Sequence, residues 1–230
     1  MNSFVLKIIA CFSMLMDHLG YVVIGSTSFF NCIGRLAFPI FAFQLTEGYS
    51  HTKNLKKYFF RLLIFACLSQ IPFMLFSSIF TEEITINIIF VLVLGLLFMT
   101  IYDKFNKILG ITFGIVLAIL AQLLHFDYGW YGLAIIMIFH IFKKHKILMS
   151  TCFIIATFTK YIVSIVDLGV LTILNVFTTI NLYSLLCLST CLALIFISLY
   201  NNKKGPDSKY FLYVFYPVHL LILYLLNFII

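Results

Sequence analysis

The sequence predicts an all-α, polytopic membrane helix bundle, and three observations lead to that prediction. The chain has 230 residues, of which 63% are hydrophobic and only 10% are charged, with a mean hydropathy of +1.12. Soluble domains carry about 25% charged residues, so this chain has too few polar groups to cover a globular surface. Its apolar stretches also recur at the length of a membrane span. The composition therefore excludes a water-soluble enzyme, a nucleic-acid reader and a disordered adaptor, and predicts one integral-membrane domain over residues 1–230.

Nine apolar stretches are candidates for the helices, since a helix of about 20 residues crosses a bilayer core of ~30 Å. In chain order they are 4–24, 29–49, 59–80, 84–102, 108–126, 128–142, 147–166, 181–200 and 210–230. The first resembles a signal peptide, but Asp17 and His18 interrupt it and no small-x-small cleavage site follows, so we expect an uncleaved helix. Because 128–142 is short and 167–180 is an apolar connector that could be re-entrant, eight to ten helices are compatible with the pattern.

The positions of the cationic residues predict the orientation. Twelve of the 15 Lys and Arg lie in or beside four breaks: Lys53, Lys56, Lys57 and Arg61; Lys104 and Lys107; Lys143, Lys144 and Lys146; Lys203, Lys204 and Lys209. Short loops rich in Lys and Arg mark the cytoplasmic side. The alternate breaks contain the acidic residues Glu82, Glu83, Asp127 and Asp167 and no Lys or Arg. Nine helices with the N-terminus in the cytoplasm satisfy every loop, so the basic charge indicates a multi-pass protein of the cell membrane, whose partner is the lipid bilayer and not nucleic acid.

The six cysteines lie inside apolar runs, and none forms a CxxC or a Cys/His pair with zinc-finger spacing. Free cysteine is among the most buried residue types. We therefore expect buried thiols, no disulfide framework and no metal.

Two polar residues in neighbouring predicted helices are expected at similar depth. His18 lies about 14 residues into the first helix, ~20 Å from its cytoplasmic end, and Arg35 lies ~9 Å below the outer surface in the second. A charge at mid-membrane costs ~2.5–3.5 kcal/mol or more, so each needs a reason to be there. His18 is a candidate general base or acyl-carrying nucleophile, and Arg35 a candidate donor to an oxyanion or phosphate.

Asp17 is adjacent to His18 and points about 100° away from it on a helix. It is therefore expected to pair with another helix instead of orienting His18. A purely structural alternative remains open, in which an Asp17–Arg35 ion pair locks the first two helices together.

Further candidates lie nearer the cytoplasmic side and in the last helix. Glu47 near the inner end of the second helix is either an interfacial carboxylate or a functional one. The rim of His51, Lys53, Lys56, Lys57 and Arg61 is either a membrane-surface anchor or a site for the phosphates of a nucleotide-containing donor. His219 lies at mid-depth just after Pro217, where a helix break is tolerated if it lines a cavity. His125, His140 and Lys160 are interpreted as structural.

Four sequence blocks then identify a resemblance. They are KIIACFSMLMDHLG, IGRLAFPIFAFQLTEGYSHTKNLKKYFFRLLIFACLSQIPF, FDYGWYG and GPDSKYFLYVFYPVHLLILYL, which together run from residue 7 to residue 228. This combination resembles the TraX family, whose namesake is associated with N-terminal acetylation of conjugative pilin. That family in turn is similar to the membrane acyltransferase superfamily, which includes the family 3 acyltransferases that acetylate surface glycans.

The resemblance implies an acetyl-CoA-dependent N-acetyltransferase with acetyl-CoA taken from the cytoplasm as co-substrate. Its motifs coincide with Asp17-His18, with Arg35, with Glu47-Gly48-Tyr49, and with Tyr216-Pro217 and His219. His18, Arg35 and Asp17 are then the expected catalytic residues. The residues expected to bind the donor or acceptor are Glu47, Tyr49, His51, Lys53, Lys57, Arg61, Tyr216 and His219.

The acceptor that the family implies is an amine on an exported peptide or pilin, and an envelope glycan is the alternative. Two other classes stay open. The intramembrane polar residues also fit a proton-coupled transporter, and a non-enzymatic assembly subunit would pair its buried charges internally and leave no cavity.

Overall fold

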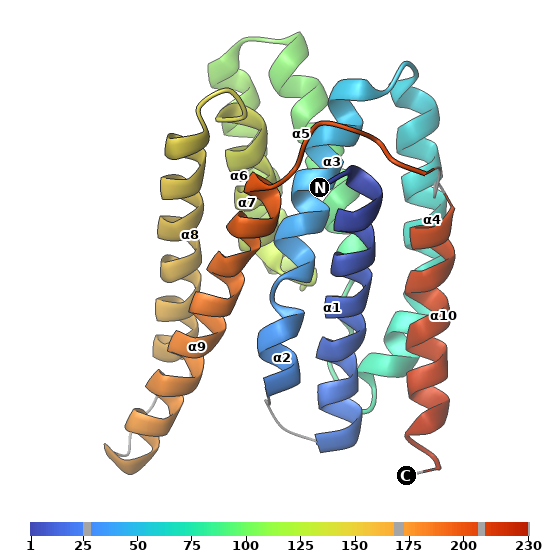
Figure 1. Cartoon of the computed structure of the whole chain (residues 1–230), viewed down its shortest axis with the longest axis vertical. Coiled ribbons are helices and arrows are strands. Elements are labelled where there is room, and N and C mark those ends of the chain that lie inside the picture. Colours follow the sequence, from blue (N-terminus) through green and yellow to red (C-terminus); the bar gives the residue numbers. More distant parts are fainter. Residues whose placement is uncertain (25–28, 168–172, 207–209, 230) are drawn as a thin grey trace.

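The computed structural model describes residues 1–24, 29–167, 173–206 and 210–229. These residues form a helical bundle without a β-strand; a single bridge joins Ile86 and Phe126. The helices are α1 (Ser3–Ile24), α2 (Phe29–Gly34), α3 (Ala37–His51), α4 (Leu55–Ser77), α5 (Ile88–Lys104), α6 (Lys107–Leu123), α7 (Gly129–Ile141), α8 (Lys146–Asp167), α9 (Ile173–Ser198) and α10 (Phe211–Leu226) (Figure 1).

The predicted all-α membrane bundle is confirmed at the level of its helices. Every expected stretch has a helical counterpart, and five helical segments are long and apolar enough to cross a membrane: Ser3–Ile24, Phe29–His51, Leu55–Ser77, Lys146–Val166 and Ile180–Ser198. The stretch 128–142 corresponds to α7, a short helix as expected. Part of the connector 167–180 lies outside the described residues, and its remainder, from Ile173, begins α9. The count of nine spans stays a prediction.

The second expected helix, 29–49, is interrupted after its first six residues. A turn at Arg35 and Leu36 separates α2 from α3. Pro39 lies in the first turn of α3, where the missing N–H is tolerated, but it cannot donate to the carbonyl of Arg35 four residues earlier. The interruption places Arg35 in a turn between two helices instead of on the surface of a continuous one.

Asparagine caps define the start of several helices. Oδ1 of Asn54 accepts a hydrogen bond from the backbone N–H of Lys57 at 2.9 Å, so α4 begins at Leu55, earlier than the apolar pattern indicates. Asn87 caps α5 in the same way, with Oδ1 3.0 Å from the backbone nitrogen of Ile89. An asparagine side chain at this position satisfies one of the N–H groups that a helix start leaves without a partner.

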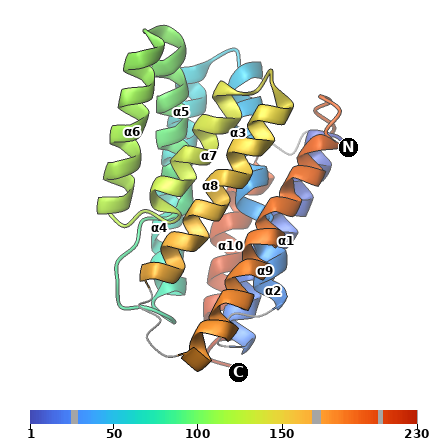
Figure 2. The ribbon, with the colours of Figure 1, turned by 90° about the vertical axis from the view of Figure 1, so that its left-hand side faces the viewer.

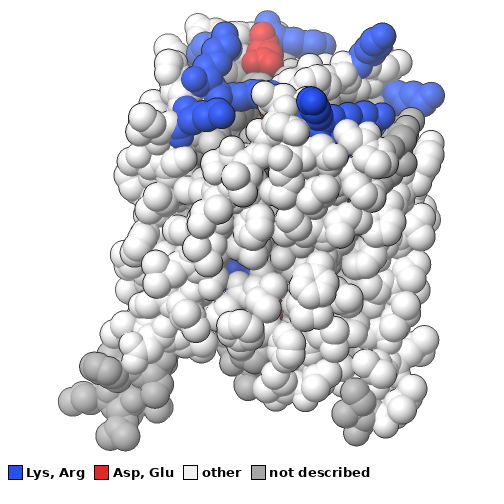
Figure 3. Space-filling view, in the orientation of Figure 1, with Lys and Arg blue, Asp and Glu red and all other residues white. Residues whose placement is uncertain are grey.

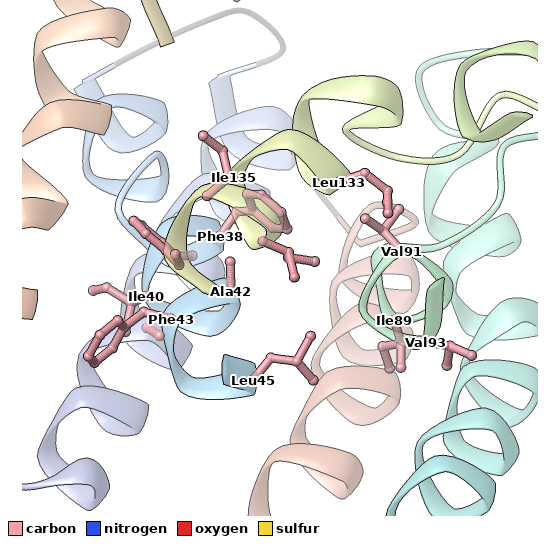
Figure 4. Close-up of a cluster of buried hydrophobic side chains, with 14 of the residues drawn as sticks. Phe38, Ile40, Ala42, Phe43, Leu45, Ile89, Val91, Val93, Leu133 and Ile135 are labelled. Carbon is pink, nitrogen blue, oxygen red and sulfur yellow. The ribbon is translucent and has the colours of Figure 1, made fainter. Parts of the chain in front are cut away.

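Helix α3 forms the centre of the core. It packs against α1, α5, α7 and α9, and its side chains Phe38 and Ile40 are 2% and 0% exposed. Apolar side chains of α3, α5 and α7 meet here, among them Val91 of α5 and Leu133 of α7 (Figure 4). Helices α8 and α9 lie side by side along one flank, α8 against α7 and α9 against α2 and α3 (Figures 1 and 2).

The basic connections share one end of the bundle. The N-terminus lies there with the links α3–α4, α5–α6, α7–α8 and α9–α10, while α4–α5 and α6–α7 lie at the other end (Figure 1). The backbone N–H of Ser3 donates to the carbonyl of Lys203 at 2.8 Å, which ties the N-terminus to the α9–α10 link. Lys and Arg side chains gather at this end on the face that Figure 3 displays. We call it the basic end.

Candidate functional site

Two histidines from opposite ends of the sequence meet inside the bundle. Nδ1 of His18 in α1 lies 2.9 Å from Nε2 of His219 in α10. Nδ1 of His219 lies 2.8 Å from the carbonyl oxygen of Phe215, one turn earlier in α10. The ring of Phe76 in α4 packs against His18, with ring centroids 4.9 Å apart. The ring of His18 is thus held by a side chain that lies 201 residues away in the sequence.

This chain of hydrogen bonds determines which nitrogen of His18 is a base. A carbonyl oxygen only accepts, so Nδ1 of His219 must carry the proton that it donates to Phe215. In a neutral imidazole the other nitrogen is then an acceptor, so Nε2 of His219 accepts from Nδ1–H of His18. Nε2 of His18 consequently keeps its lone pair. The arrangement gives His18 the tautomer that a general base requires.

Arg35 and Asp17 form an ion pair beside these histidines. Nη2 of Arg35 lies 2.8 Å from Oδ1 of Asp17, and the two side chains are 16% and 14% exposed. Asn31 of α2 also donates to Oδ1 of Asp17, at 3.2 Å, and the same guanidinium nitrogen donates to the hydroxyl of Tyr21 at 3.3 Å. Asp17 therefore pairs with another helix, as the sequence indicated, and the role of orienting His18 belongs to His219. The ion pair with Asp17 fixes the position of Arg35 and neutralises part of its positive charge.

His18, Asp17 and Arg35 line one cavity of about 270 Å³, which we call the outer cavity. It lies between α1, the α2–α3 turn, the end of α4 and the α6–α7 link. Its walls are unusually aromatic: Tyr21, Phe38, Phe41, Phe73, Phe76, Phe80, Tyr128 and Tyr216. A cavity with apolar walls and a few converging polar groups is the usual form of a small-molecule site.

A second and larger cavity opens at the basic end. We call it the basic cavity; its volume is about 690 Å³, within the range of about 300–1,000 Å³ typical of ligand pockets. Its cationic lining consists of Lys7, Lys53, Lys57, Arg61 and Lys204, with His51 beside them. Such a concentration of one charge attracts ligands of the opposite sign. The guanidinium of Arg61 is held by Tyr213, whose hydroxyl lies 3.2 Å from Nε.

The acidic residue expected in this region is neutralised. Glu47 is the single carboxylate among the described residues that line the basic cavity. Its Oε1 lies 2.7 Å from Nζ of Lys143 in the α7–α8 link, and only 8% of its side chain is exposed. Tyr49 lies outside both cavity linings and donates its hydroxyl to the carbonyl of Met99 at 3.2 Å.

The two cavities are adjacent and share four lining side chains. Met14 of α1, Phe41 of α3, Ile88 of α5 and Tyr216 of α10 belong to the linings of both cavities. Met14 precedes His18 by one turn of α1, and Tyr216 precedes His219 by one turn of α10. At a rise of about 1.5 Å per residue, each histidine lies about 4.5–6 Å further along its helix than the shared residue. The basic cavity therefore reaches to within one helical turn of His18.

The structure also places Asp127, Tyr128 and Lys160 in or beside the outer cavity. From the sequence, Lys160 is interpreted as structural, and Asp127 serves only to predict the topology. Asp127 and Tyr128 in the α6–α7 link line the outer cavity. Lys160 of α8 lies behind Tyr128, with Nζ 4.6 Å from its ring centroid and 4.7 Å from that of Tyr131. The block FDYGWYG contained Asp127 and Tyr128, so a signal was present. Only the packing of α7 against α3 reveals where these two residues lie.

Comparison with known proteins assigns the family. The family model described as TraX protein matches residues 3–227. A probable fimbrial assembly protein FimC, serogroup H1, from Dichelobacter nodosus is 29% identical over 96% of this chain and 94% of its own length. An uncharacterized protein of Rickettsia prowazekii (strain Madrid E) is 26% identical over 68% of this chain and 62% of its own. No solved structure matches significantly. The match over nearly the whole chain means that the chain belongs to the TraX family.

Proposed function

We propose that this chain is a membrane-embedded acetyltransferase that moves an acetyl group from cytoplasmic acetyl-CoA to an acceptor amine in the outer half of the membrane. The observation that carries the proposal is the pair of cavities that meet one turn from His18. Acetyl-CoA is an elongated polyanion with its thioester at the uncharged end. The basic cavity suits its phosphates, and the extension of this cavity to Met14, one turn from His18, suits its pantetheine arm.

The proposed orientation follows from the same arrangement. With the basic end in the cytoplasm, the N-terminus is inside and nine helices cross the membrane. The donor then enters from the compartment that contains acetyl-CoA. The acceptor enters the outer cavity from the other side, so neither substrate has to cross the membrane.

The transfer needs one base and one stabilised oxyanion. The acceptor nitrogen attacks the thioester carbonyl, and a C–N bond forms while Nε2 of His18 takes one N–H proton. The negative charge that develops on the carbonyl oxygen is stabilised by the guanidinium of Arg35. The C–S bond then breaks, and the departing sulfur takes the proton back from His18. The products are an N-acetylated acceptor and CoA thiol, and the enzyme returns to its starting state.

The acceptor class is drawn from the named relative. The protein from Dichelobacter nodosus is a probable fimbrial assembly protein, which favours the N-terminus of an exported, pilin-like peptide. A hydroxyl or amine on an envelope glycan is the alternative acceptor. A proton-coupled carrier is the second candidate function, because the paired histidines inside the bundle, one of which lines the outer cavity, also fit a proton path.

The test is transfer of labelled acetyl from acetyl-CoA to endogenous material in inside-out vesicles. We compare the parental protein with His18→Ala and with His145→Ala, a matched control in the exposed α7–α8 link outside both cavity linings. General-base catalysis is worth about 10²–10⁴-fold, so His18→Ala should lose that factor while His145→Ala keeps the parental rate. Equal transfer by correctly inserted His18→Ala would refute the role of His18. Absence of both transfer and an acetyl-CoA-dependent thermal shift in the parental protein would leave the carrier as the better candidate.

A further inference from the structure

The α6–α7 link is a rigid structure that presents one carboxylate to the outer cavity. Two of its residues, His125 (φ 54°) and Tyr128 (φ 64°), adopt left-handed backbone conformations, as does Gly129 (φ 43°), the first residue of α7. Such conformations are costly for residues other than glycine and are frequent at functional sites. The link is also bonded to the residues before α5, because Ile86 exchanges backbone hydrogen bonds with His125 and Asp127 at 3.0 and 2.8 Å. The position of Asp127 is therefore fixed from both sides.

The two carboxylates of the outer cavity differ in their partners. Asp17 is bonded to Arg35 at 2.8 Å and to Asn31 at 3.2 Å. Asp127 has no Lys, Arg or His nitrogen within ion-pair distance in the described part of the chain. The cationic side chain with the largest effect on it, Lys160, is held over the rings of Tyr128 and Tyr131. A carboxylate without a cation in an aromatic cavity is unusual, since half-buried charges are normally paired.

The surroundings of Asp127 fit a small organic cation with an apolar body. Its carboxylate supplies the charge, and the aromatic rings of Tyr21, Phe80 and Tyr128 line the same cavity. Aromatic faces attract ammonium groups and pack well against apolar side chains. His18, which bears the free Nε2, lines the same cavity. A ligand held by Asp127 therefore lies in the same space as the proposed base.

We propose that Asp127 is the residue that binds the acceptor, by pairing with the α-ammonium of a peptide whose first side chain is apolar and packs against the aromatic wall. This inference rests on the proposed function and narrows its acceptor to a cationic amine in preference to a glycan hydroxyl. The held ammonium releases one proton to water in the cavity before the nitrogen attacks. Asp127 acts in binding and selection, and His18 remains the base.

The proposal predicts a specific pH dependence. Burial raises the pKa of Asp127 from its ordinary value of 3.8 to about 6, against the opposing effects of Lys160 and Arg35, while Asp17 adds to the rise. Asp127 therefore loses its charge as the pH falls through about 6. A peptide α-ammonium loses its charge above about 7.7–8.0. Peptide affinity should be greatest between these limits and fall on both sides.

The experiment measures peptide binding without acetyl-CoA, by calorimetric titration of the full-length protein in detergent micelles. The probe is the amidated peptide Phe-Ala-Ala, and the matched ligand is phenyllactyl-Ala-Ala amide, in which a hydroxyl replaces the ammonium. The variants are Asp127→Asn, Asp127→Glu, which keeps the charge, and Glu83→Gln, a control carboxylate at the same end but outside the cavity lining. A retained acetyl-CoA-dependent thermal shift shows that each variant is folded, because the basic cavity is untouched.

We expect the ammonium peptide to bind at least tenfold more tightly than the hydroxyl analogue. Asp127→Asn should weaken peptide binding at least tenfold and leave the analogue unaffected, Asp127→Glu should recover part of the affinity, and Glu83→Gln should change nothing. Equal affinity for the two ligands, or an Asp127→Asn affinity within twofold of the parental value, overturns the inference. Asp127-dependent binding without acetyl transfer would instead overturn the proposed function and leave the binding site standing.

Discussion

Replacing His219 with phenylalanine removes the acceptor that holds Nδ1–H of His18. The ring shape is nearly kept, but the 2.9 Å contact between the two imidazoles is lost. Nδ1–H of His18 would then lie without a partner beside Phe76 and the new ring. His18 can avoid that cost by moving its proton to Nε2. That tautomer cannot accept a proton from the acceptor.

The size of the effect follows from the cost of a buried donor without a partner, about 1–3 kcal/mol. Each 1.4 kcal/mol corresponds to about tenfold in an equilibrium. The population of His18 with a free Nε2 should therefore fall by about 5- to 150-fold, and the transfer rate should fall with it. His219→Gln keeps an oxygen that can accept from Nδ1–H and should lose less.

Two measurements check this expectation. The first is the initial rate of acetyl transfer per folded protein, for the parental chain and both variants. The second is the rate at which diethyl pyrocarbonate, which reacts with an unprotonated imidazole nitrogen, modifies His18 as mapped by mass spectrometry. The tautomer argument predicts that both rates fall in His219→Phe and fall less in His219→Gln. Transfer within twofold of the parental rate, with unchanged modification of His18, would refute it.

Three further outcomes test the donor site, the packing of the pair and the topology. Lys57→Gln should raise the KM for acetyl-CoA about fivefold, as expected for an exposed ion contact worth about 1 kcal/mol, while Lys56→Gln, outside the cavity lining, should leave the KM unchanged. Gly34→Ala places a Cβ 2.6 Å from the carboxyl carbon of Asp17 in α1. Overpacking of this kind costs about 1–3 kcal/mol, so the variant should unfold at a lower temperature in detergent. An unchanged melting temperature would contradict this expectation. A cysteine at Lys144 should react with an impermeant maleimide only in inside-out vesicles, and one at Glu83 only in intact cells; labelling from the same side would contradict nine spans.

The helical architecture was predictable because the lengths and spacing of the apolar stretches in a membrane protein indicate its helices. Each apolar stretch between polar breaks is helical, with 29–49 divided into α2 and α3, and the basic breaks share one end of the bundle. The boundaries were less predictable, since they depend on local groups that hydropathy ignores. Asn54 starts α4 four residues before the apolar run, and Pro39 helps to end the continuity of the second stretch, although both residues were visible in the sequence.

The candidate site was predictable only where sequence neighbours determine it. The pairing of Asp17 with another helix follows from helical geometry. The prediction that Arg35 lies at the depth of His18 relied on the short link 25–28, which lies outside the described residues. The contact of His18 with His219 does not follow from such reasoning, because it depends on α10 packing against both α1 and α4. The same holds for Asp127, which reaches the outer cavity only through the fold of the α6–α7 link.

The distribution of charge also bears on the alternative of a non-enzymatic assembly subunit. A non-enzymatic assembly subunit would pair its buried charges internally and enclose no cavity. The first part of that expectation is met by two internal ion pairs, Asp17–Arg35 and Glu47–Lys143. Both pairs nevertheless border a cavity, and each cavity also has charged side chains that form no ion pair within the described residues: Lys53 and Lys57 in the basic cavity, and Asp127 in the outer cavity. The proposed function requires such a distribution of charge, because it places an anionic donor in one cavity and a cationic acceptor in the other.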